Sequence, residues 1–166
     1  MANFTMRHDL DCTEEKFWEL FFDREFTIKM FEYLEFPRFE IAETREEGDE
    51  KIRVVKATPK LDAPGPVKKL LGDNFGYTEE GRFNKTTKKF KFVVKPNTME
   101  GKLRNEGTVR IEPRDGGKKC TRIVDVIVEA KVFGLGGTIE KMTEKSFRDG
   151  WGKSATWIND WVKKNP

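Results

Sequence analysis

The sequence predicts a single α+β domain in which an antiparallel sheet of about seven strands packs against one long C-terminal helix. Two features lead to this prediction. Apolar residues recur every three or four positions from Ile139 to Trp161, which is the spacing of one helix face. Before that helix, residues 38–132 contain successive runs of alternating apolar and polar residues joined by short turns, a pattern typical of antiparallel strands.

The composition is that of one charged globular domain. The chain has 166 residues, 36% hydrophobic and 37% charged, so we expect a single domain over residues 1–166. It contains no apolar run of about 18 residues and no export signal near its start, so we expect a cytoplasmic protein. Cys12 and Cys120 are expected to be free buried thiols. With His8 as the single histidine, we expect neither a metal site nor a cofactor.

The first third of the chain predicts one strand and two short helices. Residues 4–10 alternate between apolar and polar side chains, as in a strand with one buried face. Thr13 can cap a first helix, and a second helix is expected at about Arg24–Leu34. Pro37 then ends the helical part.

Six further strands are expected before the C-terminal helix. They are a strand that starts at Phe39, then Lys51–Thr58, Gly76–Asn84, Lys88–Lys95, Met99–Ile111 and Cys120–Val132. Residues 59–75 interrupt the series, because three prolines and Gly65 oppose regular structure in the early part of this stretch. Within it, residues 67–71 could form one amphipathic turn.

The C-terminal helix follows a glycine-rich loop at 133–137, with Thr138 as the expected N-cap. Its middle is unusually small, with Gly150, Gly152, Ser154 and Ala155. A glycine inside a helix costs about 1 kcal/mol relative to alanine. The small residues either allow the helix to pack closely on the sheet or leave open volume beside a ligand.

The element order resembles that of the START-like superfamily, also called SRPBCC or helix-grip. Three local features are similar to that superfamily: residues 4–18, the strand residues Gly107–Ile111 before the Gly116-Gly117 turn, and the glycine loop and helix start at 134–140. The resemblance covers essentially the whole chain and includes no catalytic signature. It implies a curved sheet that grips the C-terminal helix around an apolar cavity. Members bind or move lipids, sterols and polyketides, and a minority are cyclases, hydrolases or subunits of larger enzymes.

We therefore expect binding, with or without transfer, of a lipid or other hydrophobic small molecule. The residues expected to contact it are His8, Glu79, Phe83, Phe90, Phe92, Leu103, Asn105, Arg122, Val124, Met142, Ser146, Phe147, Gly150, Ser154 and Trp157. One alternative is a cyclase- or hydrolase-like enzyme that uses His8 and Glu79 as an acid–base pair. The other is an interaction module with a filled core. No catalytic residue is assigned, and the sequence favours a non-enzymatic protein over an enzyme.

Two loops, 59–75 and 133–137, are expected to meet at one end of the cavity. They either connect elements in the ordinary way or gate the cavity. The gate would contain Val67, Leu70, Leu71, Phe133 and Leu135. Exposed apolar residues near Lys68 and Lys69 would suit transient contact with an anionic membrane surface.

A lysine-rich stretch between Lys85 and Arg104 raises the question of a nucleic-acid partner. Phe90 and Phe92 alternate with the lysines and point to the opposite face of the strand, so they could not stack on bases beside them. A nucleic-acid partner is therefore not expected. We expect a monomer, although the acidic first 50 residues, with 15 acidic and 6 basic side chains, leave head-to-tail pairing open.

Overall fold

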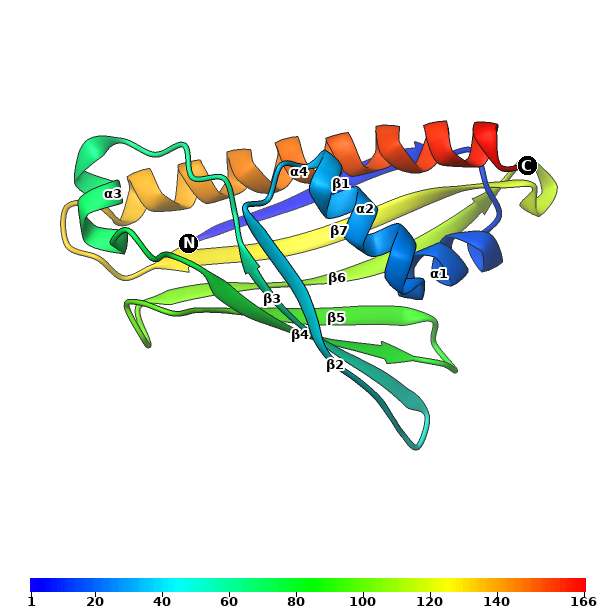
Figure 1. Ribbon diagram of the computed structural model, residues 1–166, viewed down its shortest axis with the longest axis horizontal. Helices are drawn as coiled ribbons and strands as arrows, with labels where there is room; N and C mark the ends of the chain where they lie inside the picture. Colours follow the sequence, from blue (N-terminus) through cyan, green and yellow to red (C-terminus); the bar gives the residue numbers. More distant parts are fainter.

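The computed structural model covers residues 1–166 and contains one seven-stranded antiparallel sheet in the order β1-β7-β6-β5-β4-β3-β2 (Figure 1). The strands are β1 (Ala2–Leu10), β2 (Arg38–Glu47), β3 (Glu50–Thr58), β4 (Tyr77–Asn84), β5 (Lys89–Pro96), β6 (Leu103–Arg114) and β7 (Lys119–Ala130). The helices are α1 (Glu14–Phe22), α2 (Arg24–Tyr33), α3 (Gly65–Leu71) and α4 (Gly136–Lys164), with a 3-10 turn, η1, at Asp115–Gly117. The predicted α+β helix-grip fold is confirmed.

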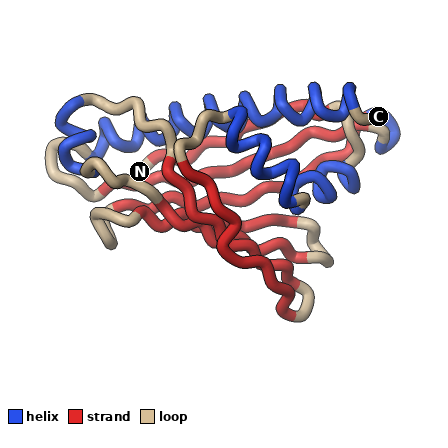
Figure 2. Tube along the Cα trace, viewed as in Figure 1, coloured by secondary structure: helices blue, strands red, loops and turns tan.

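The long helix α4 runs along one side of the sheet, against β1 and β7 (Figures 1 and 2). Phe147 packs on Phe4 and Phe92 at centroid separations of 6.1 and 6.3 Å, and Ile158 is buried further along the helix. Beyond β1 and β7, α4 reaches Phe92 of β5, and other elements must cover the inner face of β3 and β4. Helices α1 and α2 lie towards one end of the sheet and α3 lies at the other.

The end covered by α1 and α2 is filled with aromatic side chains. Trp18 lies 4.6 Å from Phe83, and Phe21 lies 4.8 Å from Phe90. Phenylalanine rings of the sheet pack directly on glycines of the neighbouring strand. A Cβ at Gly107 would come within 2.6 Å of the Phe92 ring and 2.4 Å of a backbone carbonyl oxygen. This part of the core has no room for a ligand.

Three local predictions can be checked directly, and two of them need correction. Helix α4 begins at Gly136 rather than after a Thr138 cap, because the Gly136 N–H bonds back to the Val132 carbonyl and a Cβ there would lie 2.5 Å from the Ala130 oxygen. Strand β6 begins at Leu103 rather than Met99, because residues 99–102 form a turn closed by a hydrogen bond between the two end residues. The expected cap of α1 is confirmed, since Thr13 accepts a hydrogen bond from Lys16 N–H.

The outer face of the sheet is largely polar. Lys89, Lys91 and Lys95 of β5 are exposed there, whereas Phe90 and Phe92 are buried on the inner face, as the alternation predicted. The two cysteines are free and buried, also as predicted. None of the four helices combines the length and the apolar character that a membrane crossing requires.

Candidate functional site

Side chains at the centre of the inner face remain partly exposed to solvent. Glu79, Val94 and Asn105 are direct cross-strand neighbours on β4, β5 and β6, and all three are only partly buried. Phe90 and Phe92, on the same face, are 1% and 2% exposed because helices pack on them. Strands β4, β5 and β6 each have a neighbouring strand on both sides. The partial exposure of Glu79, Val94 and Asn105 therefore requires open space above them on the inner face.

The flank of α4 is open over the same region. One stripe of the helix consists of Ile139, Ser146, Gly150 and Trp157, which are spaced by 7, 4 and 7 residues and therefore share a face. Ile139 packs against α3, and Trp157 stacks on Tyr33 of α2 with 5.2 Å between ring centroids. Between these ends Ser146 is exposed, and a Cβ at Gly150 would have no neighbour within 4 Å.

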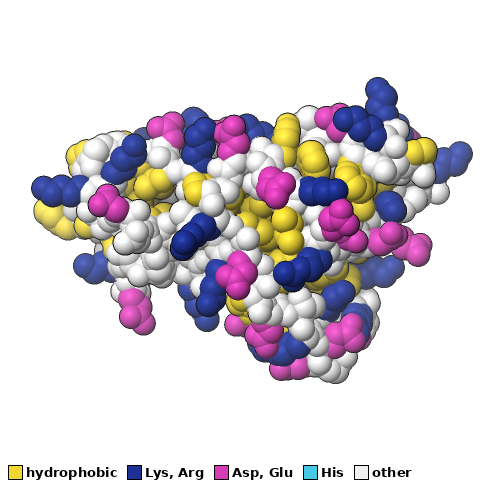
Figure 3. Space-filling view, in the orientation of Figure 1, with side chains coloured by type: hydrophobic (Ala, Val, Ile, Leu, Met, Phe, Trp, Pro, Cys, Tyr) yellow, Lys and Arg dark blue, Asp and Glu magenta, His cyan; other side chains and the backbone are white.

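These two features define a groove, which has Tyr77, Glu79, Val94 and Asn105 as its floor and the Ser146–Gly150 flank of α4 as its upper wall. Apolar side chains gather below α4, between α2 and the β2–β3 hairpin, in the middle of the face drawn in Figure 3. Phe31 of α2 and Phe39 of β2 stack face to face at 3.8 Å, and both stay partly exposed. The groove thus combines an apolar rim with a partly polar floor.

At its α3 end the groove leads to a small, partly open cavity of about 40 Å³. It is lined by residues that include Leu71, Phe75, Leu103, Asn105 and Met142. This volume holds about one water molecule, whereas small-molecule sites usually occupy about 300 Å³ or more. This cavity alone is therefore too small for a lipid.

The two expected gate loops do meet beside this cavity. Val67 and Leu71 of α3 form a cluster with Ala130 and Ile139, and Leu135 packs against it. The expectation that Val67 and Leu71 are exposed is wrong: they are 0% and 5% exposed, because the apolar side of α3 turns towards the sheet and α4.

Two other apolar residues at this end face solvent. Leu70 is 39% exposed, and Phe133, at the tip of the loop before α4, is fully exposed. Lys68 and Lys69 beside Leu70 are exposed as well. The outer side of the loop cluster therefore presents two apolar side chains together with basic ones.

The polar groups of the groove floor lack hydrogen-bond partners in the protein. The carboxyl of Glu79, the hydroxyl of Tyr77 and the side-chain amide of Asn105 bond to no other group of the protein, and all three reach solvent. Burial raises the pKa of Glu79, and the nearby Arg53 guanidinium opposes that shift. Burial also raises the pKa of Tyr77, and the Glu79 carboxyl raises it further.

Arg53 is the one cation close to this floor, and it is held among aromatic rings. It is 8% exposed, donates from Nη1 to the Phe21 carbonyl, and lies 4.5 Å from the centroid of the Phe21 ring. Burial lowers its pKa, while Glu79 raises it. On the inner face Arg53 lies diagonally across from Glu79, because their direct partners are Gly81 and Val55. No carboxylate lies within ion-pair distance of the guanidinium.

A second buried cation, Arg122, attaches α4 to the sheet. Its guanidinium donates to the Trp151 carbonyl at 2.7 Å and to Ser154 Oγ at 3.1 Å, and lies 3.2 Å from His8 Nδ1. Burial lowers the pKa of Arg122 to about 9. Burial, and then the charge of Arg122, lowers the pKa of His8 to about 4, so the imidazole accepts the hydrogen bond as a neutral group.

The acid–base pair of His8 with Glu79 is not formed. His8 lies on β1 and Glu79 on β4, four strand steps apart in the sheet. The row of Glu79 meets β1 at Ala2, six residues from His8, so at about 4.8 Å per strand and 3.4 Å per residue the two residues lie about 28 Å apart along the sheet. Direct proton transfer between them is impossible at that distance.

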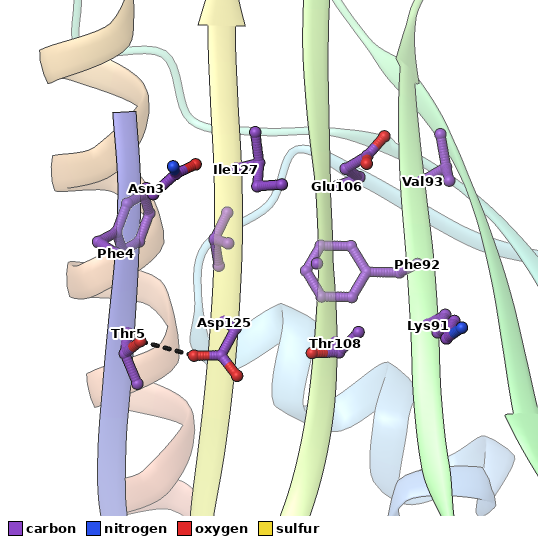
Figure 4. A pocket seen from close by; sticks show the side chains of 12 residues that line it. Asn3, Phe4, Thr5, Lys91, Phe92, Val93, Glu106, Thr108, Asp125 and Ile127 are labelled. Carbon is purple, nitrogen blue, oxygen red and sulfur yellow. Dashed lines mark hydrogen bonds between the residues drawn. The ribbon is translucent and has the colours of Figure 1, made fainter. Parts of the chain in front are cut away.

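A surface hollow of about 610 Å³ lies on the opposite face of the sheet, across β1, β7, β6 and β5 (Figure 4). Its outward side chains include Lys91, Glu106 and Asp125, and Thr5 donates a 2.6 Å hydrogen bond to Asp125. This hollow is broad, open and polar, as expected of the solvated side of a twisted sheet. The groove under α4, which has unpartnered polar groups in an apolar setting, is the better candidate site.

Residues 5–162 match the family model described as "Protein of unknown function (DUF2505)". The chain belongs to this family. The curated proteins contain no match to the DUF2505 chain.

Several solved structures share the fold of this DUF2505 chain. TTHA0849 from Thermus thermophilus aligns with a TM-score of 0.65 at 18% identity, over 98% of both chains. The Zhui aromatase/cyclase from Streptomyces sp. R1128 aligns with a TM-score of 0.64 at 11% identity, over 98% of this chain and 94% of its own. The di-domain aromatase/cyclase BexL, of the BE-7585A biosynthetic pathway, aligns at 0.63 and 9% identity, over 100% of this chain and 48% of its own. The START-like fold is thereby confirmed.

The residues predicted to contact a ligand fall into three places in this DUF2505 fold. Around the groove and its cavity lie Glu79, Leu103, Asn105, Met142, Ser146 and Gly150. Within the core packed by α1, α2 and α4 lie Phe83, Phe90, Phe92, Val124, Phe147 and Trp157. In the network that attaches α4 lie His8, Arg122 and Ser154.

Sequence reasoning missed two groove residues, Tyr77 and Arg53. Tyr77 precedes Glu79 by two positions on one strand, so the period of two could have placed both on the same face. Arg53 gave no such signal, because β3 is buried on both faces: Ile52 is fully buried and Val55 is 4% exposed.

Proposed function

We propose that the protein binds a hydrophobic small molecule in the groove between the inner face of the sheet and α4, and acts as a binding or carrier protein. The observation that carries this proposal is the open space above Glu79, Val94 and Asn105 in central strands. A filled scaffold would bury these residues as completely as it buries Phe90 and Phe92.

The driving force would be burial of apolar surface, at about 25 cal/mol per Å². The cavity of about 40 Å³ cannot hold the whole ligand, so the ligand would lie mainly in the open groove. Enclosing it further would require α3 and the loop at 131–135 to move outward, because these segments close the cavity end.

We also propose that ligand exchange takes place at an anionic membrane surface, at the outer side of the loop cluster. The exposed Phe133 and Leu70 could insert between lipids, and Lys68 and Lys69 could pair with anionic headgroups. The same loops flank the cavity end, so insertion would act on the segments that must move.

A second candidate function is catalysis of ring formation or hydrolysis on a bound hydrophobic substrate. Two of the structures with the same fold are named as aromatase/cyclases. In this chain Glu79 is the titratable carboxyl in the groove, and its raised pKa would let it donate a proton. The carrier function needs no such step, and it is the function that the groove supports best.

Titration with the uncharged fluorophore Nile red tests the proposed function. Binding in the groove predicts a saturable increase in fluorescence with one site per chain. The protein denatured in urea serves as the control for nonspecific partitioning. A linear, unsaturable response with the folded protein would refute the proposal.

A further inference from the structure

The floor of the groove offers a set of unpartnered polar groups. Tyr77 and Glu79 lie two residues apart on β4, and Asn105 lies two strands away from Glu79 in the same row. At about 4.8 Å per strand and 3.4 Å per residue, the three side chains surround a patch about 7 to 10 Å across. A protein polar group in an apolar site costs free energy unless it finds a partner, so water or a ligand must supply one.

These groups offer both donors and acceptors. The Tyr77 hydroxyl and the Asn105 amide can donate and accept. Burial raises the pKa of Glu79, but the Arg53 guanidinium opposes that shift, and the Glu79 carboxylate accepts hydrogen bonds. A ligand oxygen such as a carbonyl or hydroxyl satisfies this combination.

The charges near the floor are balanced. Arg53 contributes one cation and Glu79 one ionisable carboxyl, as diagonal neighbours. Of the other inward cations, Lys51 lies over the Phe22 ring and Arg122 of β7 is bound to α4, while Lys145 and Lys153 of α4 are exposed to water. A carboxylate on the ligand would face Glu79, and an ammonium would face Arg53. Either charge would be desolvated without a partner of its own.

We propose that the ligand carries an uncharged oxygen function, a hydroxyl or a carbonyl, which hydrogen-bonds polar groups of the set Tyr77, Glu79 and Asn105, and that the groove rejects carboxylates and amines of the same skeleton. This inference rests on the proposed function, because it names the class of ligand for the same groove. The charge balance between Arg53 and Glu79 sets the specificity, and the apolar rim supplies the affinity.

Displacement of Nile red by three compounds of equal chain length tests the inference. The compounds are 1-decanol, decanoate and decylammonium, at about pH 7.5 and below their micelle concentrations. The expected result is that decanol displaces Nile red at a concentration at least about tenfold lower than either ion, since an unpaired buried charge is costly. Equal competition by an ion, or no competition by decanol, overturns the inference. Absence of saturable Nile red binding overturns the proposed function instead.

Substitution of Glu79 tests whether this residue sets the preference for uncharged ligands. Glu79→Gln keeps the size of the side chain and its ability to hydrogen-bond, but it leaves the positive charge of Arg53 without a nearby negative charge. Decanoate should therefore bind at least about tenfold more tightly, while the affinity for decanol should change little. Glu80→Gln is the matched control, because Glu80 lies on the outer face with Arg82. It should change the affinity for neither decanoate nor decanol. Unchanged decanoate affinity in Glu79→Gln contradicts the inference.

Tyr77→Phe provides a second variant that removes one hydroxyl and no packing. It should lower the affinity for decanol by about threefold to tenfold, as expected for the loss of one hydrogen bond to the alcohol, and leave the affinity for Nile red unchanged. Equal decanol affinity in the variant and the parent contradicts a role for this hydroxyl. Thermal melting of each variant shows whether it is folded, so a loss of binding can be separated from a loss of structure.

Discussion

Replacing Gly150 by leucine separates a binding groove from a packed scaffold. An added Cβ at this position meets no atom within 4 Å, and Gly150 lies between the parts of α4 that pack on α3 and α2. A leucine side chain would project into the groove over its polar floor. If the groove is the binding site, the variant should lose binding and keep its fold.

The expected effect on stability is an increase. Glycine inside a helix is about 1 kcal/mol less favourable than alanine or leucine, and open space removes the overpacking penalty of about 1–3 kcal/mol. For a chain of this size, about 1 kcal/mol raises the melting temperature by about 2–4 °C. Gly150→Ala should show the same increase and measure the helix contribution alone.

The ligand affinity of the Gly150→Leu variant should fall while its stability rises. A four-carbon side chain in the groove removes space that the ligand needs, and we expect Nile red affinity to fall at least about tenfold. Thr156→Leu, on the exposed side of the same helix, is the control and should leave affinity unchanged. A Gly150→Leu variant that is destabilised by about 1–3 kcal/mol, or that binds as tightly as the parent, would refute the groove.

Further predictions concern the rest of the fold. Between about pH 6.5 and 4 the unfolded state binds a proton on His8 that the folded state does not, so acid should lower the unfolding free energy by about 1–2 kcal/mol, after allowing for solvent around the half-buried ring. His8→Gln should flatten that slope in urea titrations, and an unchanged slope would assign it to other groups. Gly107→Ala should destabilise the fold by about 2 kcal/mol or more, since the added Cβ meets the Asp125 carbonyl oxygen at 2.4 Å; a melting temperature equal to the parent's would contradict the close contact. Phe133→Ser should reduce co-sedimentation with vesicles rich in phosphatidylserine and leave binding in the groove intact, whereas equal sedimentation would rule out insertion of this side chain.

Local patterns in the sequence predict most of this fold because they follow from single elements. Alternation placed Phe90 and Phe92 inside and their lysine neighbours outside, and the spacing from Ile139 to Trp161 predicted α4. Errors occurred where backbone hydrogen bonding outweighed side-chain preference. The start of α4 is set by a close approach of Gly136 to Ala130, which no propensity of Thr138 reveals.

The candidate site was less accessible to prediction because it depends on strand order. The sequence placed both His8 and Glu79 on inward faces, but only the sheet order shows that three strands lie between them. The same limit applies to α3. Its apolar side was recognisable, yet whether Val67 and Leu71 face solvent or the core depends on contacts with Ala130 and Ile139, far away in the sequence.

Native mass spectrometry of the protein purified from its own cells tests the central claim most directly. A carrier that holds its ligand under α4 predicts one hydrophobic small molecule per chain, lost on extraction with organic solvent and missing from Gly150→Leu. A parent protein that carries no such molecule, or a variant that retains it to the same extent, would contradict binding in the groove.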